Sequence, residues 1–179
     1  MDTFFEQIVV RKSKPIERVL QGIMMVACAA LCILLFLFSF YFSGSVLKPV
    51  LMALGLGTPF AGYYALTSLY TEYEYCITNG YFDIDCIKGK RKRKRMISTG
   101  CDKIEVFGKY SDKKEQLAAQ QFGSKVYAAN LSSDNLYYAI VNHKTKGRTL
   151  IVIEPNERVL GAIVKFMPKL VARDAGFRN

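Results

Sequence analysis

The sequence predicts an α+β membrane protein, in which a two-helix hairpin precedes a small β-rich domain. Two long apolar runs contain no charged residue, Val19–Leu47 and Pro49–Thr71, and only Lys48 separates them. The chain that follows alternates apolar and polar residues in short segments and carries most of the net charge of +10. A last segment has helical periodicity. We therefore expect two membrane helices, then a seven-stranded antiparallel barrel or sandwich capped by a C-terminal helix.

The apolar runs define a transmembrane hairpin over residues 19–71, with helices at about 20–42 and 49–70. A bilayer core of roughly 30 Å needs about 20 apolar residues per helical crossing, and both runs meet that length. Positive charges precede the first run and follow the second, whereas the turn between them holds only Lys48. Because positive segments stay on the cytoplasmic side, we expect a multi-pass protein of the inner membrane with both termini in the cytoplasm.

Small residues recur every four positions along the second run, at Ala53, Gly57, Ala61 and Ala65. Such a stripe lets two helix backbones approach closely, so it predicts the helix-packing surface. The first helix is the obvious partner, and a homodimer through the same stripe is the alternative. No ionisable residue lies inside either run, which argues against a transporter or channel.

Residues 1–18 are expected to form an interfacial N-terminal helix. Thr3 and Glu6 have the spacing of a capping box, and Phe4, Phe5, Ile8 and Val9 share a face at a spacing of four. The basic residues that follow would lie at the lipid surface. A docking motif for a protein partner is the other interpretation.

Residues 72–179 are expected to form a cytosolic domain of short strands. Asn79–Gly80 predicts a tight hairpin, because both residues tolerate positive φ, and Gly89 permits a second turn. Residues 108–123 break the alternation and predict either a long loop or one to two helical turns. Asn156 is a good helix cap, and Pro168 should kink or stop the final helix.

Seven strands and a closing helix resemble the pleckstrin-homology (PH)-like fold. The segment Tyr75–Gly80, followed by Phe82–Asp85 and Ile104–Val106, resembles bacterial membrane-anchored PH-like proteins in particular. The opening Met1–Val9 is similar to that of a small uncharacterised family of clostridial proteins with two transmembrane helices. The resemblance implies a fold more firmly than an activity, because one fold hosts many functions.

A basic run lies in the second predicted hairpin of the domain. It comprises Lys88, Lys90, Arg91, Lys92, Arg93, Lys94 and Arg95. The PH-like resemblance implies that such a hairpin contacts anionic lipid, and each Lys or Arg near an anionic leaflet contributes about 1 kcal/mol. Two alternatives stay open: a topology signal that enforces the positive-inside rule, and a solvated strand that resists edge pairing.

The sequence gives little support to other chemistries. The basic run lacks interleaved aromatic residues, so no nucleic-acid partner is expected. The five cysteines and His143 lack the spacing of a metal site, and no cofactor motif occurs. His143 has no evident nucleophile partner, and Asp83 and Asp85 are expected to offset neighbouring lysines rather than to act as an acid–base pair.

These patterns favour a non-enzymatic, membrane-anchored adaptor or scaffold whose basic hairpin contacts anionic lipid of the inner leaflet. The alternative is a structural subunit of a larger membrane complex, which binds a protein partner through the small-residue stripe or a sheet edge.

Overall fold

The computed structural model describes residues 4–13, 15–42 and 45–177. Its contacts divide the chain into two units, a helix unit of residues 12–70 and a sheet unit of residues 1–11 and 71–179. The chain therefore starts in the sheet unit, passes through both long helices and returns at Thr71 to complete the sheet unit.

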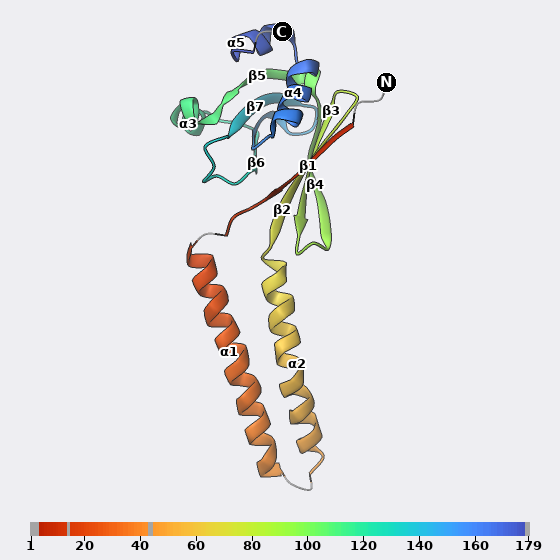
Figure 1. The fold of residues 1–179 in the computed structure, drawn as a ribbon, viewed down its shortest axis with the longest axis vertical. Coiled ribbons are helices and arrows are strands. Elements are labelled where there is room, and N and C mark those ends of the chain that lie inside the picture. Colours follow the sequence, from red (N-terminus) through yellow and green to blue (C-terminus); the bar gives the residue numbers. More distant parts are fainter. Residues whose placement is uncertain (1–3, 14, 43–44, 178–179) are drawn as a thin grey trace. The chain divides into compact units, whose positions relative to one another are not determined.

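The helix unit is a pair of long helices, α1 and α2 (Figure 1). Helix α1 spans Pro15–Ser39 and continues as the short 3₁₀ helix η1, Phe40–Phe42, while α2 spans Leu47–Ser68. Both are long and apolar enough to cross a membrane. Pro59 cannot donate to the carbonyl of Gly55 one turn earlier, and the hydroxyl of Thr58 donates to that carbonyl instead, at 2.8 Å. The helix thus continues through the proline with this acceptor satisfied.

The small-residue stripe does not form the surface between α1 and α2. Ala53, Gly57 and Ala61 are exposed and Ala65 is half-buried, whereas the buried residues of α2 are Gly55 and Gly62. A Cβ atom at Gly62 would lie 2.9 Å from Cys28 Sγ, but one at Gly57 would meet nothing within 4 Å. The prediction that the stripe packs on the first helix is wrong, because two glycines seven residues apart already provide the close approach.

Among the described residues, the sheet unit contains eight strands, in two four-stranded sheets with the orders β1-β2-β3-β4 and β5-β7-β8-β6. The strands are β1 Phe4–Val10, β2 Thr71–Thr78, β3 Tyr81–Lys88, β4 Lys92–Gly100, β5 Ile104–Lys109, β6 Ser124–Ala128, β7 Tyr137–His143 and β8 Gly147–Ile153. The pairs are antiparallel except β6 with β8, which is parallel. The sequence predicted a seven-stranded antiparallel barrel or sandwich over residues 72–179, and seven strands, β2–β8, occur there. They form two sheets and not a clear barrel, β1 adds an eighth strand, and the antiparallel expectation is wrong for β6 with β8.

Residues 4–10 form strand β1 and not the expected helix. They pair with β2 along their whole length, from Phe4 opposite Thr78 to Val10 opposite Glu72. A spacing of four residues is a multiple of two, so Phe5 and Val9 share a face in a strand as they would in a helix. That face packs on the core. Thr3, the expected helix cap, lies outside the described residues.

Three further helices complete the sheet unit: α3 Tyr110–Ala119, α4 Glu157–Phe166 and α5 Lys169–Asp174. Asn156 caps α4 as predicted, since its Oδ1 accepts the backbone N–H of Val159 at 2.8 Å. Pro168 separates α4 from α5. Residues 108–123 were expected to form either a long loop or a short helix, and α3 shows that they contain a helix. The short 3₁₀ helix η2, Cys101–Lys103, joins β4 to β5.

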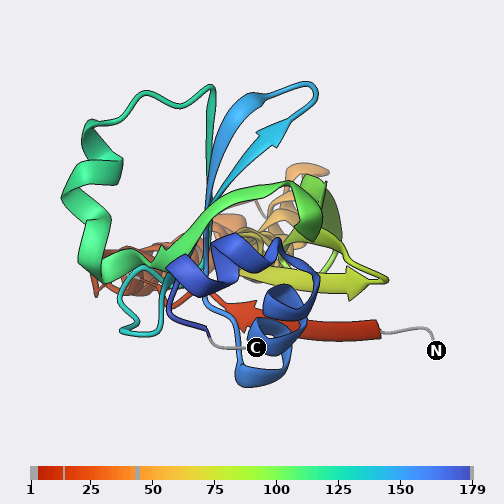
Figure 2. The same ribbon diagram turned by 90° about the horizontal axis from the view of Figure 1, so that it is seen from above.

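The core has two parts because the second sheet is covered on both faces. Its inner face packs with the inner face of the first sheet and with α4, through residues such as Ile84, Ile151 and Ile163. Its other face packs with α3 through Leu117, Ile140 and Leu150. Helices α3 and α4 accordingly lie at different sides of the unit (Figure 2).

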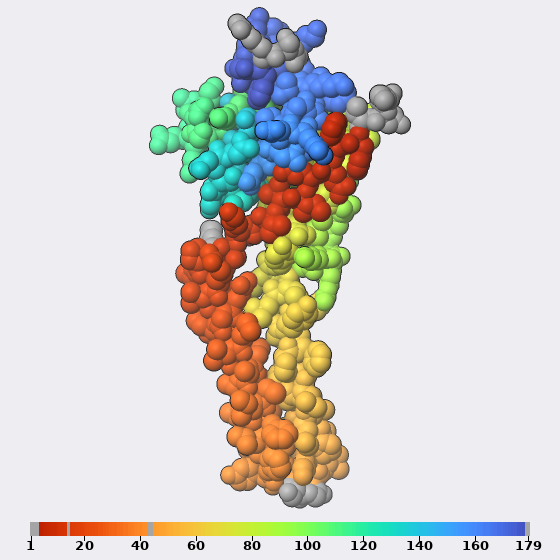
Figure 3. Space-filling view, viewed as in Figure 1, coloured from red at the N-terminus to blue at the C-terminus, as the bar shows by residue number. Residues whose placement is uncertain are grey.

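A polar junction joins the two sheets at the start of α4. The hydroxyl of Tyr75 on β2 donates to the carbonyl of Ala128 at the end of β6 and accepts the N–H of Glu154 at 3.1 Å. Gln7 on β1 donates to the Glu154 carbonyl at 2.9 Å and accepts the N–H of Asn156 at 2.7 Å. Figure 3 shows β1, in red, at the surface of this unit beside the blue C-terminal segment.

We predict that Tyr75→Phe destabilises the sheet unit by about 1–3 kcal/mol, because the buried carbonyl of Ala128 and the half-buried N–H of Glu154 each lose their partner. Thermal unfolding of the full chain in detergent measures this. Tyr81→Phe is the matched control, since Tyr81 is exposed and should tolerate the change. Equal melting temperatures for both variants would contradict the role of the junction.

We predict that Gly62→Leu separates α1 from α2 and that Gly57→Leu leaves the pair intact. The added side chain at Gly62 would meet Cys28 across the helix pair. The rate at which an apolar maleimide modifies Cys28 in detergent should rise severalfold in Gly62→Leu alone. Unchanged rates in Gly62→Leu, or a faster rate in Gly57→Leu, would contradict this packing.

Candidate functional site

The basic run forms the end of the β3–β4 hairpin. Lys88 closes β3, Gly89–Arg91 makes the turn, and Lys92 begins β4. Gly89 and Lys90 both have positive φ, 58° and 57°, and Arg91 N donates to the Lys88 carbonyl at 3.1 Å. The turn geometry thus confirms the prediction that Gly89 permits a hairpin here.

Strand alternation divides the basic run between the two faces of the first sheet. Across the strands, Lys94 is in register with Cys86 and Tyr73, and Lys92 with Lys88 and Thr71. Tyr73 packs against the core, so Lys88, Lys92 and Lys94 belong to the core-facing side of the sheet. All three lysines are nevertheless exposed. We call these three residues the lysine face.

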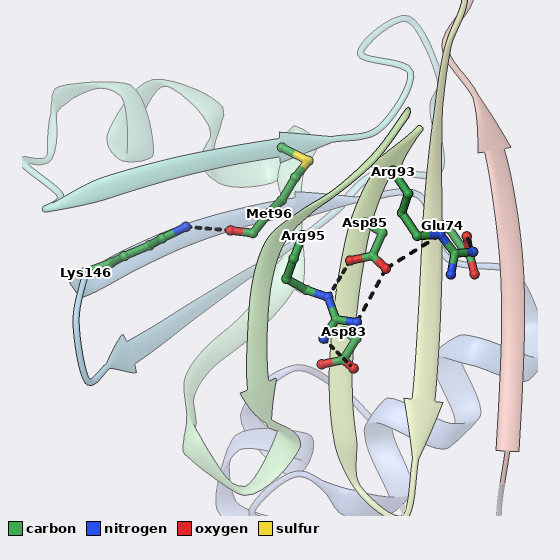
Figure 4. Close-up of polar contacts among 7 residues, drawn as sticks. All are labelled: Glu74, Asp83, Asp85, Arg93, Arg95, Met96 and Lys146. Atoms are coloured by element: carbon green, nitrogen blue, oxygen red, sulfur yellow. Dashed lines mark hydrogen bonds and ion pairs between the residues drawn. The ribbon is translucent and has the colours of Figure 1, made fainter. Parts of the chain in front are cut away.

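Two of the three arginines, Arg93 and Arg95, lie on the opposite, outer face, in a cluster with three carboxylates (Figure 4). Arg95 pairs with both oxygens of Asp85, with Nη2 to Oδ2 at 3.4 Å, and its Nη1 lies 2.9 Å from Asp83 Oδ2. Arg93 pairs with Glu74, and its Nε lies 3.9 Å from Asp85 Oδ2. We call these five residues the ion-pair cluster. The expectation that Asp83 and Asp85 offset lysines is wrong, because their partners are arginines.

The ion-pair cluster satisfies carboxylates that are almost removed from solvent. The side chains of Glu74 and Asp85 are only 8% and 9% exposed, whereas Arg93 and Arg95 are more than half exposed. Hydrogen bonding to Asp85 raises the pKa of Arg95, which keeps the guanidinium charged. A carboxylate at such depth needs a charged partner, so the arginines hold β4 against β3 and β2.

A β-bulge at Met96 produces this division. Ile84 is opposite Ile97 but Asp85 is opposite Arg95, so Met96 is an extra residue on β4. In a regular strand Arg93, Arg95 and Ile97 would share one face. The bulge reverses the alternation, so that Ile97 is buried in the core and the arginines lie on the outer face. Lys146, from the β7–β8 turn, donates to the Met96 carbonyl (Figure 4).

Sequence reasoning named the seven basic residues but missed Glu74, Met96 and Lys146. The carboxylates carried a usable signal, since Glu74, Asp83 and Asp85 alternate with apolar residues beside the basic strand. The bulge carried none, because nothing in Arg95–Ile97 distinguishes a bulge from a regular strand. The position of Lys146 depends on the packing of two distant hairpins.

The other residues considered for chemistry lie apart from this hairpin. His143 Nδ1 contacts the backbone N and the hydroxyl of Thr145, at 3.3 and 3.1 Å. Cys101 is buried, and burial raises the pKa of its thiol to about 12. The described residues contain no group of three or more His, Cys, Asp or Glu that could hold a metal ion.

We predict that Arg95→Gln destabilises the sheet unit by about 1–3 kcal/mol, because it leaves the nearly buried Asp85 carboxylate without its bidentate partner. Lys94→Gln removes the same charge from the adjacent position of β4, where no described carboxylate is paired with it, and should change stability by less than about 0.5 kcal/mol. Chemical denaturation of both variants measures the difference. Similar losses would show that net charge, and not pairing, stabilises the hairpin.

One of the comparisons with known proteins identifies a family. The family model described as "Bacterial PH-like domain (DUF6106)" matches residues 1–173. No curated protein matches the chain, and no solved structure does. Since the family model covers nearly all of the sequence, both long helices included, the chain belongs to the bacterial PH-like domain family DUF6106.

Proposed function

We propose that this protein is a non-enzymatic adaptor or scaffold of the inner membrane, anchored by α1 and α2, whose basic hairpin contacts anionic lipid. Membership of a PH-like family supports a scaffold or adaptor role. The single observation that carries the lipid part is the register of the first sheet, which pairs Thr71 with Lys88 and Lys88 with Lys92.

Covalent connectivity keeps this end of the sheet near the end of α2. Helix α2 ends at Ser68 and β2 begins at Thr71, so two residues link them. The three Cα–Cα steps from Ser68 to Thr71 reach at most about 11 Å. Neighbouring strands are about 4.8 Å apart, so the backbone of Lys92 lies about 10 Å from Thr71. If α2 spans the bilayer, the basic hairpin remains within roughly 20 Å of the point where the chain leaves it.

That distance is short enough for the charge of the inner leaflet to act on the hairpin. The surface potential of anionic lipids decays over a Debye length, about 8–10 Å at physiological salt. Two membrane helices already supply the anchoring energy. The lysines would therefore orient the sheet unit or gather anionic lipid around the protein.

The charge distribution supports a cytoplasmic position for both termini. Arg11, Lys12 and Arg18 precede or begin α1, the basic hairpin follows α2, and the intervening segment has only Lys48. By the positive-inside rule, this pattern favours a position of the α1–α2 turn on the far side of the membrane.

A non-enzymatic role is the simplest account of the reactive side chains. The ring of His143 contacts Thr145 in a turn, and the raised pKa of Cys101 keeps its thiol protonated. A thiol nucleophile requires the opposite condition, a lowered pKa and access to solvent.

The second candidate is a structural subunit that binds a protein partner, or a second copy, through a sheet edge or the small-residue stripe. Strand β1 favours it, because β1 is an edge strand with Phe4, Ile8 and Val10 exposed. The stripe at Ala53, Gly57 and Ala61 is also directed away from α1. Loss of one stoichiometric crosslinked partner in Gly57→Leu would favour this candidate.

We predict that the full chain, reconstituted in bilayers, associates several times more strongly with spin-labelled phosphatidylglycerol than with spin-labelled phosphatidylcholine. Electron paramagnetic resonance measures the ratio of association constants from the motionally restricted lipid. Attraction to the basic hairpin is screened by salt, so the ratio should fall towards one in 1 M salt. A ratio of one at low salt would overturn the lipid part of the proposal.

A further inference from the structure

Three like charges lie together on the lysine face without a counter-charge. Lys88 and Lys92 are directly opposite each other on β3 and β4, and Lys94 follows on the same side of β4. Their in-register neighbours on this face are Thr71, Tyr73 and Cys86, none of which is acidic. Within residues 4–13, 15–42 and 45–177, none of the three lysine side chains forms a hydrogen bond or ion pair.

Such an arrangement costs stability in the isolated domain. Like charges directly opposite each other on one face of an antiparallel pair are destabilising. Lys146 adds a further positive charge from the β7–β8 turn, where it contacts the carbonyl of Met96. Acidic residues lie close to this hairpin, since Asp83 and Asp85 are on β3 and Glu74 is on the neighbouring strand β2. All three belong to the outer face.

The outer face differs from the lysine face in this respect. Arg93 and Arg95 are bound to three carboxylates, two of them almost buried, so their charge is neutralised within the protein. An anionic surface would have to displace a bidentate carboxylate to bind Arg95. Exposed lysines need no such exchange, because their ammonium groups give up only water.

We infer that the basic run has two separate roles, and that the lysine face of Lys88, Lys92 and Lys94 is the surface that binds an anionic membrane. Arg93 and Arg95 are positioning residues, which hold β4 against β3 so that the lysines are presented together. This inference rests on the proposed function, and it assigns the lipid contact to one face of the hairpin.

Alternation along β4 offers a matched test, because adjacent residues carry the same charge on opposite faces. Lys92→Gln/Lys94→Gln and Arg93→Gln/Arg95→Gln each remove two positive charges from the same strand. The lipid association ratio of phosphatidylglycerol to phosphatidylcholine is measured for the full chain in bilayers, together with the melting temperature of the sheet unit.

We expect the lysine pair to lower the association ratio at least about twofold at an unchanged melting temperature. The arginine pair should keep the ratio and lower the melting temperature, because its carboxylates lose their partners. Equal reductions of the ratio in both variants would overturn the inference, as they would show that total charge decides. A parent ratio of one would instead overturn the proposed function itself.

A charge-neutral variant covers the case in which the arginine pair fails to fold. Glu74→Gln/Asp85→Asn/Arg93→Gln/Arg95→Gln removes two carboxylates together with Arg93 and Arg95, so the net charge is unchanged and neutral amides replace all four groups. The parent association ratio is expected in this variant. A ratio reduced as far as in Lys92→Gln/Lys94→Gln would assign the lipid contact to the arginines and contradict the inference.

Discussion

The sheet unit depends on the polar junction at the start of α4, where Tyr75 and Gln7 join the first sheet to the second. Burial raises the pKa of Tyr75 well above its ordinary value, so its hydroxyl stays protonated and donates to Ala128 while it accepts from Glu154. Gln7 occupies two further backbone groups beside it. Both side chains bond backbone at the end of β8, so the helix that closes the core begins at a fixed place.

This junction also explains why the first sheet includes a strand, β1, that precedes the two long helices in the sequence, while its other strands follow them. Strand β1 supplies Gln7, and the chain then passes through α1 and α2 before β2 supplies Tyr75. The sheet unit is therefore closed only when the segments before and after the helices pair. The backbone N–H of Arg11 donates to the carbonyl of Thr71 at 3.0 Å, just beyond the paired residues of β1 and β2. Both connections to the helix unit therefore leave from the same end of the sheet.

The sequence predicted the parts governed by local rules. The apolar runs, the Asn79–Gly80 and Gly89 turns and the Asn156 cap depend on composition or on the φ preferences of one or two residues, and the structure has them. It did not predict β1, because Phe5 and Val9 share a face both in a helix and in a strand. Only the pairing with β2 determines that residues 4–10 form a strand. Nor did it predict the packing glycines of α2, since Gly55 and Gly62 are seven residues apart and less regular than the stripe of small residues.

The functional site could be predicted least well from the sequence, because a single β-bulge determines which basic side chains are paired with carboxylates. Without the extra residue at Met96, strand alternation would direct Arg93 and Arg95 towards the core-facing side and leave Glu74 and Asp85 without partners. With it, the arginines reach the carboxylates, and Lys92 and Lys94 are left on the side that carries no acid. Five basic residues that look uniform in sequence therefore have two electrostatic states. Arg93 and Arg95 are neutralised inside the protein, whereas Lys88, Lys92 and Lys94 form a positive surface that an external anion can neutralise.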